Sequence, residues 1–219
     1  MSLISSAAGS GGSAGDHLEI IPFERAHSRA LGRVLSEAFI DDPVWTAIGP
    51  RNRSHRRISN RASFAGILAG ARRHRARIRV ARLDGRLVGG TIAFDSESWP
   101  MPDRAALWET GWFLLAGPAP ALRGFRDDVA MKSVHVSHPH TYLWFIAVDP
   151  RLHGRGVGRR LIAELHEHSD PFGLPVYLET ATESNVSFYN SLGYVMEGEI
   201  ELPSGPTMWR MERPAPSPL

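Results

Sequence analysis

The stretch VDPRLHGRGVGRRL, at residues 148–161, decides how the rest of the chain is interpreted. Glycines alternate along it at positions 154, 156 and 158, and apolar residues at helical spacing follow. The preceding YLWFIAV, residues 142–148, is apolar at every position, as in a strand buried on both faces. The spacing therefore predicts a buried strand, a glycine-rich loop and a helix over residues 156–168.

A glycine-rich loop at the start of a helix is suited to binding an anion. Backbone N–H groups at a helix start lack intrahelical partners, and the helix dipole favours negative charge there. Glycines remove the β-carbons that would block a close approach. Arginines at positions 151, 155, 159 and 160 add positive charge along the same stretch. The loop therefore predicts a cradle for a diphosphate.

Three other interpretations of the loop can be compared with this one. A Walker P-loop needs Lys and then Ser or Thr after its glycines, whereas Gly158 is followed by two arginines. A dinucleotide-binding fingerprint reads G-x-G-x-x-G, whereas this loop reads G-x-G-x-G and lies late in the chain. A purely structural turn stays open on the evidence of the loop alone.

Length and composition fit one ordinary globular domain. The chain has 219 residues, of which 42% are hydrophobic and 22% charged, enough for one full core. We expect a flexible Gly/Ser-rich tail at residues 1–16, a single domain at 17–213 and a short tail at 214–219. The absence of cysteine excludes disulfides, thiolate metal sites and a catalytic cysteine.

Charge and hydropathy narrow the choice of partners and location. The formal net charge of +2 gives weak support to nucleic-acid binding, which only an arginine-rich segment at 55–75 favours. No apolar run approaches the roughly 18 residues of a membrane helix, and the start of the chain lacks signal-peptide features. We expect a cytoplasmic monomer or homodimer with no nucleic-acid or membrane partner.

The periodicity along the chain predicts a mixed α/β sheet with one late parallel unit. Strands are expected at residues 18–23, 142–148, 175–181, 194–202 and 206–213, and a hairpin at 78–94 turns at Asp84-Gly85. Helices are expected at residues 27–39, 55–75, 104–115, 120–134, 156–168 and 184–191. Pro43 ends the first helix, and the segment Phe39–Pro43 is interpreted as a loop.

Two segments together resemble the GNAT superfamily of N-acyltransferases. Residues 148–162 resemble its acyl-CoA motif, Q/R-x-x-G-x-G/A, with Gly156 and Gly158 at the glycine positions. His153 stands where the family prefers glutamine or arginine. FYNSLGY, residues 188–194, resembles the family signature LYxxLGF, and the whole pattern is similar to the puromycin N-acetyltransferase branch.

The resemblance implies a GNAT fold: a mixed central sheet of six to seven strands, splayed between two central parallel strands and flanked by helices. It implies direct transfer of an acetyl group from acetyl-CoA to a primary amine, without a metal, and a small-molecule amine is the expected acceptor. The pantetheine arm would enter between strands 142–148 and 175–181. The cofactor-binding residues expected from it are Ile146, Ala147, Val148, His153, Gly154, Arg155, Gly156, Val157, Gly158, Arg159 and Asn185.

Tyr189 and Glu179 are the candidate catalytic residues. A phenol has a pKa of about 10 and a thiol one of about 8.5, so Tyr189 can protonate the departing thiolate. Glu179 lies in an apolar strand, where a carboxylate is costly unless it is paired or reactive, and it could take a proton from the ammonium. An aromatic core role for Tyr189 and a structural role for Glu179 stay open, as does the identity of the general base.

The remaining candidates have alternative roles. Asn185 could contact the pantetheine arm or cap the last helix. HVSHPH, residues 135–140, has the spacing of a metal site but no accompanying carboxylate or cysteine. His138 or His140 could instead form a polar wall of the acceptor pocket or shuttle protons, but solvated loop histidines are favoured over either role. Trp99, Trp108, Trp112 and Phe113 are expected to form core or line the acceptor pocket, opposite Phe39–Pro43.

Two further functions remain as alternatives. The acceptor could be a protein N-terminus or a lysine, although the aromatic residues at 99–113 disfavour an open acidic groove. The chain could also be a CoA-binding or ligand-binding module without turnover, against which the intact Tyr189 and the glycine loop argue.

Overall fold

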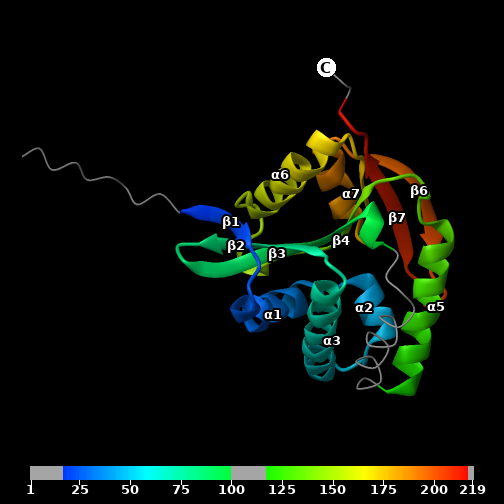
Figure 1. The fold of residues 1–219 in the computed structure, drawn as a ribbon. Coiled ribbons are helices and arrows are strands. Elements are labelled where there is room, and N and C mark those ends of the chain that lie inside the picture. Colours follow the sequence, from blue (N-terminus) through cyan, green and yellow to red (C-terminus); the bar gives the residue numbers. More distant parts are fainter. Residues whose placement is uncertain (1–16, 100–116, 217–219) are drawn as a thin grey trace, which may run out of the picture.

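Seven strands form one mixed sheet in the computed structural model, which describes residues 17–99 and 117–216 (Figure 1). The strands are β1 Leu18–Pro22, β2 Arg77–Leu83, β3 Arg86–Asp95, β4 Thr141–Val148, β5 Val176–Thr180, β6 Val195–Glu201 and β7 Thr207–Arg213. Their order is β1-β2-β3-β4-β5-β7-β6, and only β4 and β5 are parallel. The predicted mixed sheet with one parallel unit is therefore confirmed.

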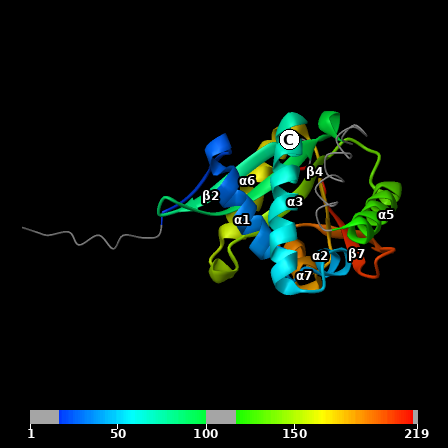
Figure 2. The ribbon, with the colours of Figure 1, turned by 90° about the horizontal axis from the view of Figure 1, so that it is seen from below.

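Helices cover both faces of the sheet. They are α1 Ser28–Ala38, α2 Pro43–Ile48, α3 Arg53–Arg73, α5 Pro118–Val134, α6 Val157–Ser169 and α7 Glu183–Asn190. Figures 1 and 2 show α1 and α3 on one face and α6 on the other. Leu31 and Phe64 join Val80 in one core cluster, and Ile162 and Leu178 belong to a second. Burial of these apolar side chains drives the assembly of the layers.

The two central strands separate after a short parallel ladder. Only Thr141, Tyr142 and Leu143 of β4 pair with β5, opposite Val176, Tyr177 and Leu178. Beyond that point β4 stays paired with β3, and β5 stays paired with β7. The register of β4 with β3 shifts at the opening, where Trp144 is left without a partner residue and forms a bulge. The predicted splay is confirmed.

One helix in the described chain was not predicted. Pro43 is the first residue of α2, where its missing N–H costs nothing, and Asp42 accepts hydrogen bonds from the N–H groups of Val44 and Trp45. The segment predicted as a loop therefore leads into a short helix. The predicted helix at 104–115, with Trp108, Trp112 and Phe113, lies outside the described residues, as does the predicted tail at 1–16.

Within residues 17–99 and 117–216, the helices lack the combination of length and apolarity that crossing a bilayer requires.

Candidate active site

The glycine loop ends in an open helix start. Gly156 precedes α6, and no side chain caps that end of the helix. Among the described residues, no acceptor bonds the N–H groups of Gly154 or of residues 156–159. Gly154 and Gly156 have φ angles of +78° and +79°, and a β-carbon on either would meet no atom within 4 Å. The loop therefore presents several unpaired amides to an open space.

The arginines around this loop differ in their partners. Arg151 forms a bidentate pair with Asp149, at 3.0 and 2.7 Å, and Arg160 pairs with Glu167 at 3.2 Å. Arg159 donates to Ser191 Oγ at 2.8 Å and lies over the Phe188 ring. The expectation that all four arginines add charge at the loop is therefore corrected, because carboxylates neutralise two of them. The positive charge of Arg159 is not offset in this way, because the partner of Arg159 is a hydroxyl group.

A cavity of about 220 Å³ lies at the splay between β4 and β5. Strands β4 and β5 line it together with α2, α5, α7 and the residues next to them, and Asp42, Trp45, Asp127, Ile146, Glu179 and Tyr189 are among the lining residues. Ile146 and Asn185, two of the predicted cofactor-binding residues, line the same cavity as both candidate catalytic residues. Ala147 and Val148 follow on β4 and lead toward the glycine loop.

Tyr189 is buried in the wall of this cavity. Its ring packs against Phe188 and Tyr194, with centroids 5.2 and 5.4 Å away. Its hydroxyl has no hydrogen-bond partner among the described residues, and burial raises the pKa of the phenol. The side chain is thus protonated and unpartnered, so its hydrogen can be directed at a group bound in the cavity.

Glu179 lies on β5 with its side chain only 5% exposed. Its Oε1 is 3.4 Å from His135 Nδ1. Burial, together with the Glu179 charge, raises the pKa of both Tyr142 and Tyr177. The carboxylate thus faces the cavity on one side and polar rings on the other, as a proton acceptor does.

The structure corrects the predicted histidine stretch. His140 is 5% exposed, and its Nε2 lies 3.1 Å from His135 Nε2. His138 is the exposed member and contacts Glu212 at 2.6 Å. The favoured interpretation of solvated loop histidines was therefore wrong for His135 and His140, because the stretch folds back over Tyr142 and Tyr177. Within the described parts of the chain, no cluster of metal-ligating side chains has the geometry to hold an ion.

Asn185 does not cap α7. Thr182 occupies the N-cap position, and the Asn185 amide Nδ2 donates to Thr180 Oγ1 at 3.2 Å. Capping by Asn185 was therefore wrong, and the side chain instead joins the end of β5 to the helix beside the cavity. Trp99 is partly buried and packs against Phe94, Tyr142 and Trp144, at the edge of the core.

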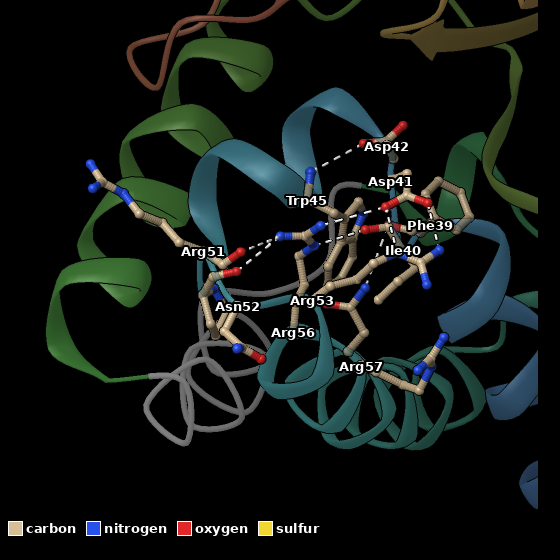
Figure 3. Close-up of polar contacts among 12 residues, drawn as sticks. Phe39, Ile40, Asp41, Asp42, Trp45, Arg51, Asn52, Arg53, Arg56 and Arg57 are labelled. Carbon is tan, nitrogen blue, oxygen red and sulfur yellow. Dashed lines mark hydrogen bonds and ion pairs between the residues drawn. The ribbon is translucent and has the colours of Figure 1, made fainter.

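A buried arginine holds the wall that α2 contributes (Figure 3). Arg56 is 6% exposed; its Nε donates to the carbonyl of Ile40 at 2.7 Å and its Nη1 to that of Pro50 at 3.0 Å. These carbonyls lie before and after α2, so one guanidinium joins both ends of the helix to α3. Trp45 of α2 stacks on Phe64, with centroids 4.6 Å apart.

Helix α5 forms the opposite wall. Arg123 donates to the Ile48 carbonyl of α2 at 2.8 Å. Asp127 accepts from the backbone and the hydroxyl of Ser204, between β6 and β7, at 3.0 and 2.6 Å. No local pattern in the sequence marks Trp45 or Asp127, because each reaches the site through contacts with residues distant along the chain.

Comparisons with known proteins agree with this architecture. An acetyltransferase from Corynebacterium glutamicum, described as related to a histone acetyltransferase, has a similar structure, with a TM-score of 0.69 at 24% identity over 92% of this chain and 98% of that one. The ribosomal-protein-alanine N-acetyltransferase of Escherichia coli has a TM-score of 0.54 at 15% identity, over 93% and 99% of the two chains. A Drosophila melanogaster polyamine N-acetyltransferase has a TM-score of 0.54 at 16% identity, over 90% and 99%.

Sequence comparisons are more limited in extent. An uncharacterised Mycobacterium leprae protein is 41% identical over 49 residues, a segment that spans 22% of this chain and only 14% of that relative. The model of the acetyltransferase (GNAT) family matches residues 37–194, which include the splayed strands, the glycine loop and Tyr189. By this match over most of its length, the chain belongs to the acetyltransferase (GNAT) family.

Proposed function

We propose that the protein transfers the acetyl group of acetyl-CoA directly to a primary amine of a small molecule. The observation that carries the proposal is the cavity at the splay, where Tyr189 and Glu179 share walls with the unpaired edge of β4. A reacting amine in this cavity would have a proton acceptor and a proton donor close by.

The residues present fit acetyl-CoA, which would supply an acetyl group activated as a thioester. The unpaired amides at residues 154 and 156–159 suit its diphosphate. The free edge of β4 at Ile146, Ala147 and Val148 suits its amide-bearing arm, which could add to the sheet like a strand. His153, Arg155 and Asn185 would lie beside the bound acetyl-CoA.

Two side chains would move protons. Glu179 takes one from the acceptor ammonium, because only a neutral amine is nucleophilic. Tyr189 donates one to the departing sulfur, and its raised pKa keeps it protonated until then. The absence of cysteine from the whole sequence agrees with direct attack rather than a cysteine thioester.

The lining of the cavity favours a cationic acceptor with an apolar body. All the charged side chains among the described lining residues are carboxylates: Asp42, Asp127, Asp128 and Glu179. Burial raises the pKa of Asp42 and of Asp127, so a bound cation would stabilise their charged forms. Trp45, Phe125 and Phe145 supply aromatic surface between them.

A panel of amines with acetyl-CoA tests the proposal, with acetylated products identified by mass spectrometry and free CoA followed with a thiol reagent. The panel includes arylalkylamines, diamines, puromycin and peptides with a free N-terminus. We expect turnover of small amines, lowered about 100-fold or more in kcat by Tyr189→Phe and by Glu179→Gln. Turnover of peptides alone would identify a protein acetyltransferase, and CoA binding without turnover would identify a non-catalytic module; either result overturns the proposal.

A further inference from the structure

A chain of polar contacts continues behind Glu179, away from the cavity. Glu179 Oε1 is 3.4 Å from His135 Nδ1, and His135 Nε2 is 3.1 Å from His140 Nε2. His140 Nδ1 ends the chain, 2.7 Å from the carbonyl oxygen of His138. Glu179 lines the cavity, whereas neither histidine does.

The carbonyl at the end of the chain fixes where the hydrogens lie. A carbonyl oxygen only accepts, so His140 Nδ1 carries a hydrogen. Burial lowers the pKa of His140, which favours a neutral ring with a lone pair on Nε2. His135 Nε2 must then donate to that lone pair. A neutral His135 consequently directs the lone pair of its Nδ1 at the Glu179 carboxyl group.

We propose that Glu179 and His135 act as one proton-accepting pair, and that His140 is the positioning residue that keeps the Nδ1 lone pair of His135 aimed at Glu179. Without a proton between them, a lone pair faces a carboxylate, which is unfavourable. Uptake of one proton, on either partner, turns this contact into a hydrogen bond. The pair is therefore a stronger base than Glu179 would be beside an Nδ1–H group.

The catalytic role of the Glu179–His135 pair rests on the proposed acetyl transfer, whereas the positions of the hydrogens on the two histidine rings do not depend on it. An N–H bond of the acceptor ammonium breaks, its proton joins the Glu179–His135 pair, and the electron pair stays on nitrogen. The neutral amine then forms its bond to the acetyl carbon as the carbon–sulfur bond breaks, and Tyr189 protonates the departing sulfur. The nitrogen loses its second proton, which restores the Tyr189 phenol directly or through solvent. The proton returns to solvent after the product leaves.

The rings around His135 hold it in this orientation. Tyr142 of β4 and Tyr177 of β5 each meet it edge to face, with centroids 4.8 Å away, and Trp99 lies 5.6 Å away. Beyond these phenols, the titratable and charged groups near the pair among the described residues are Asp128 of α5, His138, and Arg210 and Glu212 of β7.

Nuclear magnetic resonance of the full chain with isotope-labelled histidine tests the arrangement directly, because long-range proton–nitrogen correlations distinguish the two tautomers. We expect His140 to carry its hydrogen on Nδ1 and neutral His135 to carry it on Nε2. In His140→Leu, His135 gains the freedom to place its hydrogen on Nδ1, facing Glu179. A wild-type His135 with its hydrogen on Nδ1 alone, or a tautomer unchanged in His140→Leu, overturns the proposal.

Glu179→Gln gives a second measurement if His140→Leu does not fold. The glutamine amide donates to His135 Nδ1, so His135 should stay neutral, with its hydrogen on Nε2, throughout the titration. His138→Asn is the matched control, because it keeps the backbone carbonyl and changes a side chain that bonds Glu212 and packs on the His140 ring at 5.9 Å without a hydrogen bond to it. It should leave the His135 tautomer as in the wild type. A His135 that still becomes protonated in Glu179→Gln as readily as in the wild type contradicts the pairing.

The pH dependence of kcat/KM tests the catalytic role of the Glu179–His135 pair. One amine is used throughout, so that its own protonation contributes equally in every variant. His140→Leu should move the acid limb to lower pH by roughly one unit, since an Nδ1–H group stabilises the carboxylate. His138→Asn should leave the limb in place. A lower kcat in His140→Leu without any shift indicates a merely structural role and overturns the proposal. If no amine is turned over, the proposed function fails, and the spectra alone decide the pairing.

Discussion

The glycine loop and the amine side of the cavity follow one another along β4, but they are built differently. The loop consists of consecutive residues, 153–159, and offers mainly backbone amides. The amine side consists of side chains from α2, α5, β5 and α7, fixed by contacts such as those of Arg56 and Asp127. A site made of main chain depends on local conformation, whereas a site made of side chains depends on the whole fold.

This difference predicts that the two regions can be disabled separately. Changes in the loop should lower CoA affinity without changing amine selection. Changes behind α2 or β5 should alter amine use or stability while CoA binding is kept. Three substitutions test this separation, in order of decreasing effect.

Gly156→Asp should have the largest effect. The new carboxylate would compete for the unpaired amides at the start of α6 and repel a diphosphate. We expect CoA affinity, measured by calorimetry, to fall by about 100-fold, the loss of one or two charge-assisted hydrogen bonds. The fold should persist, because a β-carbon there meets open space.

Gly173→Asp is the matched control for this change. Gly173 also has a positive φ angle, +62°, and open space around its β-carbon, but it lies after the C-terminal end of α6. Both variants therefore carry similar backbone strain. Equal losses of CoA affinity in the two would mean that strain, rather than the amides at Gly156, explains the result.

Arg56→Met tests the amine side. It removes the donor shared by the carbonyls of Ile40 and Pro50 and leaves both without that partner. We expect a loss of about 2 kcal/mol in the free energy of unfolding, measured with denaturant. The KM for the amine should rise, because α2 carries Trp45 and Asp42 into the cavity, while CoA affinity stays within about twofold.

Arg53→Gln serves as the comparison for Arg56→Met. Arg53 pairs with Asp41 on the same segment, but both side chains are more than half exposed. An exposed ion pair contributes little, so this variant should keep the wild-type stability and amine KM. A drop in CoA affinity as large as the rise in amine KM in Arg56→Met would show that the two regions are not separable.

The same contrast explains what could be predicted from the sequence. The alternation of Gly154, Gly156 and Gly158 after an apolar strand is a local pattern, and it correctly placed a strand, an open loop and α6. The hairpin at Asp84-Gly85 was predicted for the same reason, since both residues need the positive φ angles that they adopt. The splay of β4 and β5 followed from the family resemblance rather than from any pattern of residues.

The residues that were missed depend on long-range contacts. Pro43 is compatible both with ending a helix and with starting one, and only the Asp42 cap and the Arg56 contacts decide for α2. His140 is buried and His135 is largely covered because the segment between α5 and β4 folds over Tyr142 and Tyr177. Periodicity carries no information about such contacts, and so the walls that α2 and α5 contribute to the amine side could not be derived from the sequence.

His166→Gln should have the smallest effect. It tests whether the pH dependence of stability and the pH dependence of activity arise in different regions. His166 lies on α6 near the end opposite the glycine loop, where burial, with a smaller contribution from Arg213, lowers its pKa from 6.5 to about 4. Between these values the unfolded chain binds a proton that the folded chain does not. The stability that the neutral ring contributes is therefore complete above pH 6.5 and is lost as the pH falls toward 4.

The substitution should reduce this loss of unfolding free energy at low pH by about 1 kcal/mol. The effect is modest because solvent screens a partly exposed ring. The glutamine can keep a hydrogen bond to the Tyr194 hydroxyl, which lies 3.1 Å from His166 Nε2. Denaturant unfolding at a series of pH values measures the slope, and His168→Gln on the same helix, whose ring contacts Asp95, provides the control. The acid limb of kcat/KM should not move in His166→Gln, since Glu179 and His135 lie elsewhere. If the acid limb of kcat/KM moved together with the pH dependence of stability, the loss of activity at low pH would result from unfolding at α6 rather than from protonation of the base in the cavity.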